Sequence, residues 1–587
     1  MTLGRDELRE RLRHLVLHEA ASARRSFEES IAKSVPERVE AGDCVDRLTW
    51  VDGASPPLLL HAEEFHAKYR EEEALWLSDG QKVEDGLEVQ FVSWDPVRRQ
   101  ILVRQDRWSR GDPALLADCA HLCLDRRELG LERLLLEGLD TVFAAGNEHV
   151  AELLTGRRRE PADEERKRAA RSYAEGLGFT AAQVEAFAAA IGTEDVALIQ
   201  GPPGTGKTRV LAELALYLAS KRCKIFVCAF THRALDHLLL SIRKLSKELP
   251  IFKVGRPKAG ATDLKPAGIA SVSSLDRLRW PPGGCIVGGT PFVMRKHSTE
   301  RRFHFAILDE AGQMPLVHGA MAMTAARRII VAGDPAQLPP VAQGEYRDPK
   351  LGASVHLHLE RIRESILLDR SFRLNEGLCS FISGEFYHGR LQSADAAAER
   401  RLVSIPVEDE LLGRVLDPQH ALVHAKIGHL GRFRRSPEEA RVISGFLAQV
   451  QGRVPPQEIA VLSPFRQQVR AIRSELDQAD LLAEGLVVDT VERMQGQERE
   501  LIILSLASSD RDYLAAQAEF YFEPGRLCVA ISRARSKCIV VGSPEVLRAR
   551  PKRLEALVAT ARLHRCLAAS HVVDLSEHAL VKGEAGR

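Results

Sequence analysis

The sequence lacks the marks of a protein that is exported or held in a membrane. The opening stretch Met1–Glu10 carries charges where a signal peptide needs an apolar core. No uninterrupted apolar run is long enough to span a bilayer. Basic residues are in no excess, since the net charge is +1, and this excludes a uniformly basic nucleic-acid-binding chain. We therefore expect a cytoplasmic protein with no membrane partner, on which any nucleic-acid surface is a local patch.

Paired cysteines are also missing. The ten cysteines are scattered, and the nearest two, Cys119 and Cys123, have no second pair or histidine couple at the spacing of a tetrahedral metal site. We expect reduced, structural thiols, with metal or iron–sulfur ligation as the alternative. No internal repeat stands out, and the tail after Arg548 has no nuclease-like cluster of carboxylates.

What is present is the composition of a globular protein, 45% hydrophobic and 28% charged, in a chain long enough for about four domains. The first 175 residues begin with apolar residues at helical spacing, continue over 44–103 with short segments in which apolar and polar residues alternate, and then return to helical spacing. This pattern predicts a helical stalk with a small β-barrel over 1–175. Buried strands then alternate with helices over 176–345 and again over 346–547, which predicts two parallel α/β domains. A basic amphipathic helix is expected in the tail, 548–587.

Apolar runs of strand length recur through both α/β regions. In the first they are Val196–Ile199, Lys224–Ala229, Cys285–Gly288, Phe303–Leu308 and Arg328–Ala332, and in the second Ala421–His424, Ile459–Leu462, Leu486–Val488, Leu501–Leu506 and Cys538–Val541. The strands of the first region end in polar or glycine residues, and the ends of its strands are where an open parallel sheet binds its ligands.

The most informative stretch is a glycine-rich loop that ends in Lys207 and Thr208. It fits the pattern G-x-x-x-x-G-K-[ST], follows an apolar strand and precedes a helical pattern. This arrangement aims backbone N–H groups and the positive end of a helix at a polyphosphate. Lys207 is suited to neutralise the β- and γ-phosphates, and the Thr208 hydroxyl is suited to ligate Mg²⁺. The predicted nucleotide loop consists of Gly201, Pro202, Pro203, Gly204, Thr205, Gly206, Lys207 and Thr208.

Two later strands of the first region end in further candidate residues. Asp309 and Glu310 follow one apolar strand, where Asp309 suits Mg²⁺ binding and Glu310 suits the orientation and deprotonation of a water molecule. Gln337 follows the next strand and could register a γ-phosphate. The second region supplies two arginines, Arg373 and Arg533, and we expect both to neutralise charge that develops during phosphoryl transfer.

Together these segments resemble the motifs of a known family. The ordered set is GPPGTGKT, AFTHRALDHLL, DEAGQ, GDPAQLPP, LDRSFRLN, VDTVERMQGQE and VAISRAR. It is similar to the superfamily 1 helicases and, more narrowly, to their 1B group, typified by the nonsense-mediated-decay helicase and its immunoglobulin-mu-binding relative. The match covers about 180–545. The resemblance implies an α/β fold with two tandem RecA-like motor domains, a helical stalk and an accessory barrel, with ATP and Mg²⁺ as cofactors and single-stranded nucleic acid as partner.

The resemblance also implies roles for individual positions. Gln183 matches a glutamine that reads adenine, Phe372 an aromatic that stacks on the base, and Glu498 an acidic residue near the ribose. Contacts to the phosphates of a single strand fall to Thr231, Thr290, Ser463 and Thr490. Such contacts are largely independent of base sequence. The chain departs from the pattern at Cys528, where relatives often have asparagine, and at Met494, where they often have phenylalanine. The stretch before Cys285 is also short, so we expect the helical insertion that many relatives carry to be missing or vestigial.

Three functions are compatible with these motifs. The first is an ATP-dependent helicase or translocase, for which the 1B resemblance implies 5′-to-3′ movement. The second is a nucleic-acid-stimulated ATPase that remodels complexes without separating a duplex. The third is a nucleotide-switched scaffold with slow hydrolysis, which Glu310 and the two arginines argue against. Phosphate and stacking contacts serve DNA and RNA alike, so the sequence leaves the substrate open, together with protein partners and oligomeric state.

Overall fold

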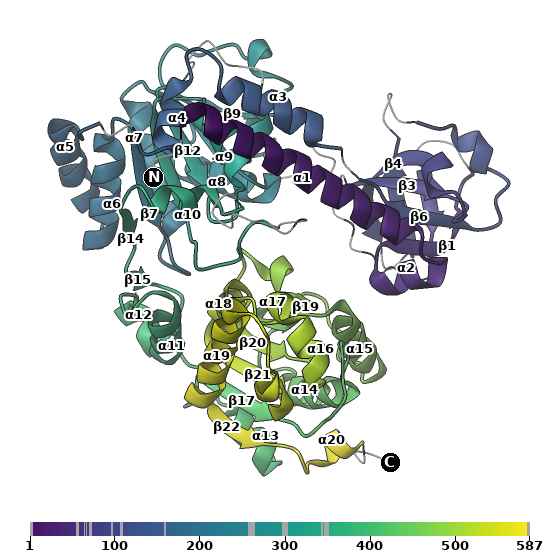
Figure 1. Ribbon diagram of the computed structural model, residues 1–587. Coiled ribbons are helices and arrows are strands. Elements are labelled where there is room, and N and C mark those ends of the chain that lie inside the picture. Colours follow the sequence, from purple (N-terminus) through teal and green to yellow (C-terminus); the bar gives the residue numbers. More distant parts are fainter. Residues whose placement is uncertain are drawn as a thin grey trace.

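The chain forms a stalk and barrel followed by two α/β domains (Figure 1). The computed structural model describes residues 4–53, 58–63, 65, 67, 69, 73–95, 98–105, 110–128, 130–157, 160–255, 264–295, 303–341, 344 and 352–583. The alternating segments over 44–103 also predict a hairpin turn at Asp95–Pro96, of which Pro96 lies outside the described residues. Among the described helices, none is both long enough and apolar enough to cross a membrane.

The stalk is a long helix that connects the first α/β domain to the barrel (Figure 1). Helix α1 (Arg5–Ile31) buries its expected apolar stripe, including Leu8, Leu12 and Val16, against the helices that follow the barrel. Those helices are α3 (Glu132–Val142) and α4 (Glu148–Leu154). The stripe works because positions three and four apart share one face of a helix.

The barrel is closed, in the strand order β1-β2-β5-β4-β3-β6, which confirms the expected small barrel. Its strands are β1 (Cys44–Trp50), β2 (Leu58–His61), β3 (Ala74–Ser78), β4 (Leu87–Asp95), β5 (Gln100–Arg104) and β6 (Leu122–Arg126). Helix α2 (Val35–Ala41) packs on β1 and also reaches the second α/β domain. There Arg470 Nη2 donates to the Val39 carbonyl at 3.1 Å, and Gln467 Nε2 donates to Glu40 Oε1 at 2.9 Å.

The first α/β domain is a parallel sheet in the order β10-β9-β11-β8-β12-β13-β7-β14, with an apolar core on each face. Its strands are β7 (Val196–Gln200), β8 (Lys224–Ala229), β9 (Ile251–Val254), β10 (Ala270–Val272), β11 (Cys285–Gly289), β12 (Phe305–Asp309), β13 (Arg328–Gly333) and β14 (Ser365–Leu367). Its helices are α5 (Glu164–Glu175), α6 (Ala181–Gly192), α7 (Lys207–Ser220), α8 (His232–Leu245), α9 (Leu316–Met323) and α10 (Val355–Glu360). Because β14 pairs with β7, this sheet continues beyond the expected boundary at 345.

The second α/β domain is a parallel sheet in the order β19-β18-β20-β21-β17-β22. Its strands are β17 (Leu422–Lys426), β18 (Ile459–Ser463), β19 (Val487–Thr490), β20 (Arg499–Ser505), β21 (Ala534–Gly542) and β22 (His571–Asp574), beside a small pair, β15 (Arg370–Ser371) and β16 (Gln392–Ser393). Its helices are α11 (Glu376–Phe386), α12 (Asp395–Ala398), α13 (Glu410–Leu416), α14 (Pro437–Val450), α15 (Arg466–Gln478), α16 (Arg511–Ala516), α17 (Ala518–Tyr521), α18 (Pro524–Ser532), α19 (Leu554–Ala569) and α20 (Ala579–Lys582).

The tail differs from expectation in one respect. Helix α19 lies where a basic amphipathic helix was expected, but β22 follows it and pairs with β17. The tail therefore completes the second sheet instead of forming a separate helical element. The expected fold class, two tandem RecA-like parallel sheets with a stalk and a barrel, is confirmed by this topology.

Candidate nucleotide site between the two α/β domains

The glycine-rich loop lies between β7 and α7, at the end of the sheet. Gly201 N–H donates to the Gly333 carbonyl at 2.9 Å, which ties the loop to the end of β13. Gly204 and Gly206 have φ of 73° and 75°, the left-handed region that favours glycine. A Cβ at Gly204 would also lie 2.3 Å from the Cβ of Arg373. The loop thus needs glycine both for its turn and for the close approach of the second domain.

Lys207 is the first residue of α7 and lies between two carboxylates. Its Nζ is 3.0 Å from Asp309 Oδ1 and 2.8 Å from Glu310 Oε1. Burial alone would lower the pKa of the Lys207 ammonium, but the charges of Asp309 and Glu310 hold that pKa above its ordinary value. Burial raises the pKa of Asp309, whereas for Glu310 the Lys207 charge outweighs burial and lowers the pKa. The ammonium of Lys207 thus offsets part of the negative charge of the two carboxylates.

Glu310 has an unusual backbone conformation. It follows β12 with φ of 53°, a region that residues other than glycine rarely adopt and that recurs at functional sites. Its N–H donates to Asp309 Oδ1 at 2.8 Å, and Gln313 Nε2 donates to its Oε2 at 3.1 Å. These contacts hold the Glu310 carboxylate beside Lys207.

Arg533 extends from the second domain to the first. It ends α18, is 3% exposed, and donates through Nη2 to Gln337 Oε1 at 3.0 Å. Burial, and after it the nearby charge of Arg373, lowers the pKa of the Arg533 guanidinium to about 10. The side chain is still a cation at neutral pH. The structure therefore brings Gln337 and Arg533, which were predicted from different segments of the sequence, into direct contact.

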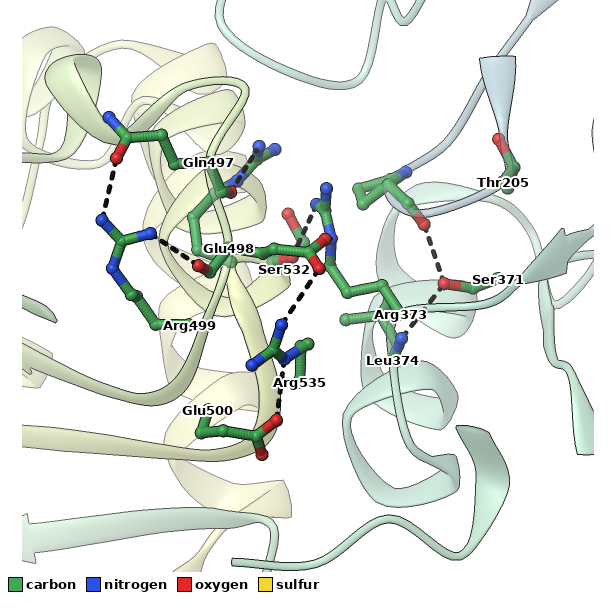
Figure 2. Close-up of polar contacts among 12 residues, drawn as sticks. Thr205, Ser371, Arg373, Leu374, Gln497, Glu498, Arg499, Glu500, Ser532 and Arg535 are labelled. Carbon is green, nitrogen blue, oxygen red and sulfur yellow. Dashed lines mark hydrogen bonds and ion pairs between the residues drawn. The ribbon is translucent and has the colours of Figure 1, made fainter. Parts of the chain in front are cut away.

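Arg373 lies against the glycine-rich loop and pairs with Glu498 (Figure 2). Its Nε is 2.6 Å from Glu498 Oε2, and its Nη1 donates to the Ser532 carbonyl at 3.2 Å. Burial acts to raise the pKa of Glu498, but the charge of Arg373 outweighs it and lowers that pKa. Ser371 Oγ donates to the Pro203 carbonyl at 2.8 Å, which binds this segment to the loop.

The two positions expected to contact the base differ in accessibility. Gln183 is buried, donates through Nε2 to the Thr205 carbonyl at 2.9 Å, and accepts at Oε1 from Thr180 N–H at 3.0 Å. Phe372 is 46% exposed, and its N–H donates to the Gly204 carbonyl at 2.8 Å. Both residues flank the glycine-rich loop, but only the phenyl ring is open to solvent.

The donor set fits a nucleotide with Mg²⁺. Oxygen ligands suit Mg²⁺, which is commonly held by one or two protein groups together with phosphate oxygens and water. Thr208, in the first turn of α7, and Asp309, at the end of β12, supply such groups. Among the described residues there is no group of three or more histidine, cysteine or acidic side chains placed to hold a metal ion by themselves. The residues present therefore match an ion that arrives with the phosphates.

The expected strand-contacting residues form two pairs. Thr231 and Thr290 follow β8 and β11, which pair in register from Cys285↔Lys224 to Gly289↔Cys228, so both lie at one edge of the first sheet. Ser463 and Thr490 end β18 and β19 and are direct partners in register. Thr231 is exposed, whereas the side chains of Ser463 and Thr490 are 0% and 6% exposed.

Sequence reasoning missed several residues at these edges. Arg466 and Arg493 follow Ser463 and Thr490 by three positions each, a spacing that offered a signal. Burial, and after it the charge of Arg493, lowers the pKa of Arg466 to about 10.

Asp334 lies inside the recognised segment GDPAQLPP but was given no role. Its partner Tyr387 lies in no recognised segment.

Comparison with known families supports the same two domains. Two protein-family models, each described as an AAA domain, match residues 178–275 and 353–545. The first covers the glycine-rich loop, and the second covers the segments that carry Arg373, Glu498 and Arg533.

Curated relatives match over the same part of the chain. The DNA replication ATP-dependent helicase/nuclease DNA2 of Xenopus laevis is 26% identical over 402 residues, covering 62% of this chain and 37% of the relative. The protein of the same name from Homo sapiens is 27% identical over 419 residues, covering 64% of this chain and 38% of the relative. The chain thus spans well under half the length of these relatives.

Solved structures also align with the chain. The crystal structure of Arterivirus nonstructural protein 10 (helicase) aligns with a TM-score of 0.37 and 14% identity, covering 85% of this chain and 76% of that one. Its complex with DNA aligns with a TM-score of 0.36 at 14% identity, covering 81% of this chain and 75% of that one.

Proposed function

This chain belongs to the superfamily 1 helicases, and from that membership we propose that it is an ATP-dependent helicase or translocase driven by two motor domains. The observation that carries the proposal is the arrangement of Arg533 and Arg373. Both arginines come from the second domain, and both lie against groups of the first, Gln337 and the glycine-rich loop. Because groups from both domains contact one nucleotide, the charge on that nucleotide influences how the two domains are positioned relative to each other.

We assign the binding of the nucleotide to the glycine-rich loop. Residues Gly201–Thr208 hold the phosphates, and Gln183, Phe372 and Glu498 surround the base and ribose. Thr208 and Asp309 would hold Mg²⁺, which supplies charge neutralisation at the β- and γ-oxygens when bound. For this to happen, Lys207 turns from Glu310 toward the phosphates.

We assign the hydrolysis step to Glu310, which the movement of Lys207 leaves without its ion pair, together with Gln337 and the two arginines. When Lys207 turns away, Glu310 loses the charge that lowers its pKa and becomes a stronger proton acceptor, able to orient a water molecule and accept its proton. Gln337 contacts the γ-phosphate, and Arg373 and Arg533 neutralise the charge that spreads over its oxygens. Arg373 must first exchange Glu498 for phosphate.

The strand lies across both domains in this proposal, in contact with Thr231 and Thr290 on the first and with Ser463 and Thr490 on the second. The hydroxyls of the second pair are buried, so we assign the contacts there to the backbone at the strand ends and to Arg466 and Arg493. Closure on ATP and opening after hydrolysis would step the strand, with 5′-to-3′ polarity. The names of the relatives favour DNA as the strand.

The proposal is tested by ATP hydrolysis with and without single-stranded DNA and RNA of matched sequence. We expect stimulation by one or both strands, and its absence with both would contradict the proposal. Duplexes with a 5′ or a 3′ overhang then separate unwinding from translocation alone. Unwinding from the 3′ overhang only would contradict the proposed polarity.

A further inference from the structure

A buried carboxylate, Asp334, lies at the junction of the two motor domains. It follows β13 and is 4% exposed. Tyr387 donates its hydroxyl to Asp334 Oδ2 at 2.6 Å, and Gln337 Nε2 donates to the same oxygen at 2.7 Å. Gln200 Nε2 lies 3.4 Å from Oδ1, to which Ala336 N–H donates at 3.3 Å. Burial raises the pKa of Asp334, and the hydrogen bonds from Tyr387 and Gln337 oppose that rise by favouring the carboxylate.

This carboxylate dictates the orientation of the Gln337 amide. A glutamine side chain has one donating and one accepting end. The carboxylate of Asp334 only accepts, so Nε2 of Gln337 faces it, and Arg533 only donates, so Oε1 faces its Nη2 at 3.0 Å. The reversed amide would place acceptor against acceptor and donor against donor. The order of contacts from Tyr387 to Arg533 is therefore fixed by chemistry as well as by geometry.

The relay, defined here as Tyr387, Asp334, Gln337 and Arg533, crosses the domain boundary twice. Tyr387 follows α11, which packs on α18 and β21 of the second domain, and Asp334 and Gln337 belong to the first. The backbone of α18 is also pressed against this loop, since a Cβ at Gly525 would lie 2.4 Å from the Gln337 carbonyl oxygen. Both ends of the relay thus belong to the second domain, and its middle belongs to the first.

We propose that Tyr387 is a positioning residue for ATP hydrolysis, which acts through Asp334 to hold the Gln337 amide toward Arg533 and the γ-phosphate. The proposal rests on the function proposed above, because it assigns Gln337 and Arg533 to the hydrolysis step. Tyr387 touches neither nucleotide nor strand in this scheme. It sets the alignment of two groups that do.

The test begins with Tyr387→Phe, which removes the hydroxyl and keeps the ring. A hydrogen bond to a charged group has a strength equivalent to about tenfold to a hundredfold in rate. We expect kcat for ATP hydrolysis to fall by about that factor while KM for ATP changes by less than about twofold. Tyr521→Phe is the matched control, since Tyr521 is also buried in the second domain but donates to the Leu506 carbonyl, at 2.8 Å. An equal loss in Tyr521→Phe, or no loss in Tyr387→Phe, overturns the proposal.

A double-mutant cycle with Gln337→Ala distinguishes positioning from a general loss of packing. If Tyr387 acts through Gln337, adding Tyr387→Phe to Gln337→Ala should change the single-turnover rate by less than about twofold. Additive losses in the double variant overturn the relay. Thermal unfolding of each variant accompanies the kinetics. If Tyr387→Phe does not fold, Asp334→Asn is measured instead. We expect its kcat to fall by at least the same factor, and a wild-type kcat in Asp334→Asn would overturn the proposal.

The outcome is separable from that of the proposed function. Stimulation of the wild-type ATPase by a single strand decides the proposed function. The ratio of variant to wild-type rates, measured also without a strand, decides the relay. A wild type that hydrolyses ATP without stimulation would refute the motor, while the cycle would still report on Tyr387.

Discussion

The ammonium of Lys207 lies 2.8 Å from the carboxylate of Glu310, the group assigned to activate water. The same ammonium is 3.0 Å from Asp309, so one cation pairs with two carboxylates. Arg373 pairs with Glu498, which also contacts Arg535. Binding of a triphosphate would exchange these internal ion pairs for contacts with phosphate.

Replacement of the loop lysine tests nucleotide binding. Lys207→Ala should abolish ATP turnover and weaken ATP binding, while the protein still folds. It leaves the buried Asp309 and the half-buried Glu310 without their cation, so we expect the free energy of unfolding to fall by about 3 kcal/mol. Lys221→Ala, at the exposed end of the same helix, serves as the control. Near-normal hydrolysis by Lys207→Ala would remove the basis of the assignment.

Replacement of the proposed base separates binding from chemistry. Glu310→Gln keeps the size of the side chain and should still bind ATP and Mg²⁺, but hydrolysis should slow by about 10² or more. The variant should then retain single strands in an ATP-dependent way, measured by filter binding. Glu248→Gln, exposed in the same domain, should behave as wild type. A parallel loss of binding and turnover would identify Glu310 as a structural residue or metal ligand.

Nucleotide preference tests the role of Gln183. Its amide offers a donor and an acceptor, both of which already contact Thr205 and Thr180, so each end has one remaining site for adenine. We expect competition assays to rank ATP above the pyrimidine triphosphates. Equal affinity for all four nucleotides would refute the assignment.

The arginine variants test the completion of the site by the second domain. Arg533→Ala should lower the single-turnover rate by about 10³ or more with a smaller effect on ATP affinity, the scale of arginine fingers in general. Arg373→Ala should behave similarly and also weaken ATP binding, because it lies against the loop. Arg565→Ala, which breaks a surface pair with Glu385, provides the control. Wild-type hydrolysis by Arg533→Ala at saturating ATP and strand would contradict the two-domain motor.

A buried lysine far from the site gives a pH-dependent prediction. Burial lowers the pKa of Lys537 from 10.5 to about 7, and its Nζ donates to the Asp417 carbonyl at 2.7 Å. Between these two pKa values the unfolded chain binds a proton that the folded chain does not, so stability should rise with pH across that window. The free energy of unfolding, measured in urea, should be about 2 kcal/mol larger at pH 9 than at pH 7 because of Lys537. The variant Lys537→Met should not show this difference. An unchanged pH slope in Lys537→Met would contradict the assignment.

Much of the fold was predictable because its signals are local. The runs of β7, β8, β11 and β13 were placed to within a residue of their bounds, since buried parallel strands are continuous apolar segments. The sequence did not predict strand β14 (Ser365–Leu367) or strand β22 (His571–Asp574). Such short edge strands are defined by pairing with a partner, here β7 and β17, rather than by their own residues.

The candidate site divides in the same way. Two parts of the site were predictable because each lies in one contiguous motif: the loop from Gly201 to Thr208, and the pair Asp309 and Glu310. The structure adds the finding that these two motifs lie next to each other. Tyr387 lies 53 positions from Asp334, and nothing in its own segment indicates a buried carboxylate as partner. The buried state of Ser463 was equally hidden, because burial is decided by helices that arrive later in the chain.

The contacts of α2 with α15 have a mechanical consequence. Helix α1, with 27 residues and a length of about 40 Å, packs against the first motor domain, and α2, which packs on the barrel, contacts the second domain through Val39 and Glu40. Three bodies joined in this way form a closed linkage. A rotation of the motor domains against each other would therefore disturb the contacts of α2 with α15. A force applied to the barrel would act on both motor domains through these contacts.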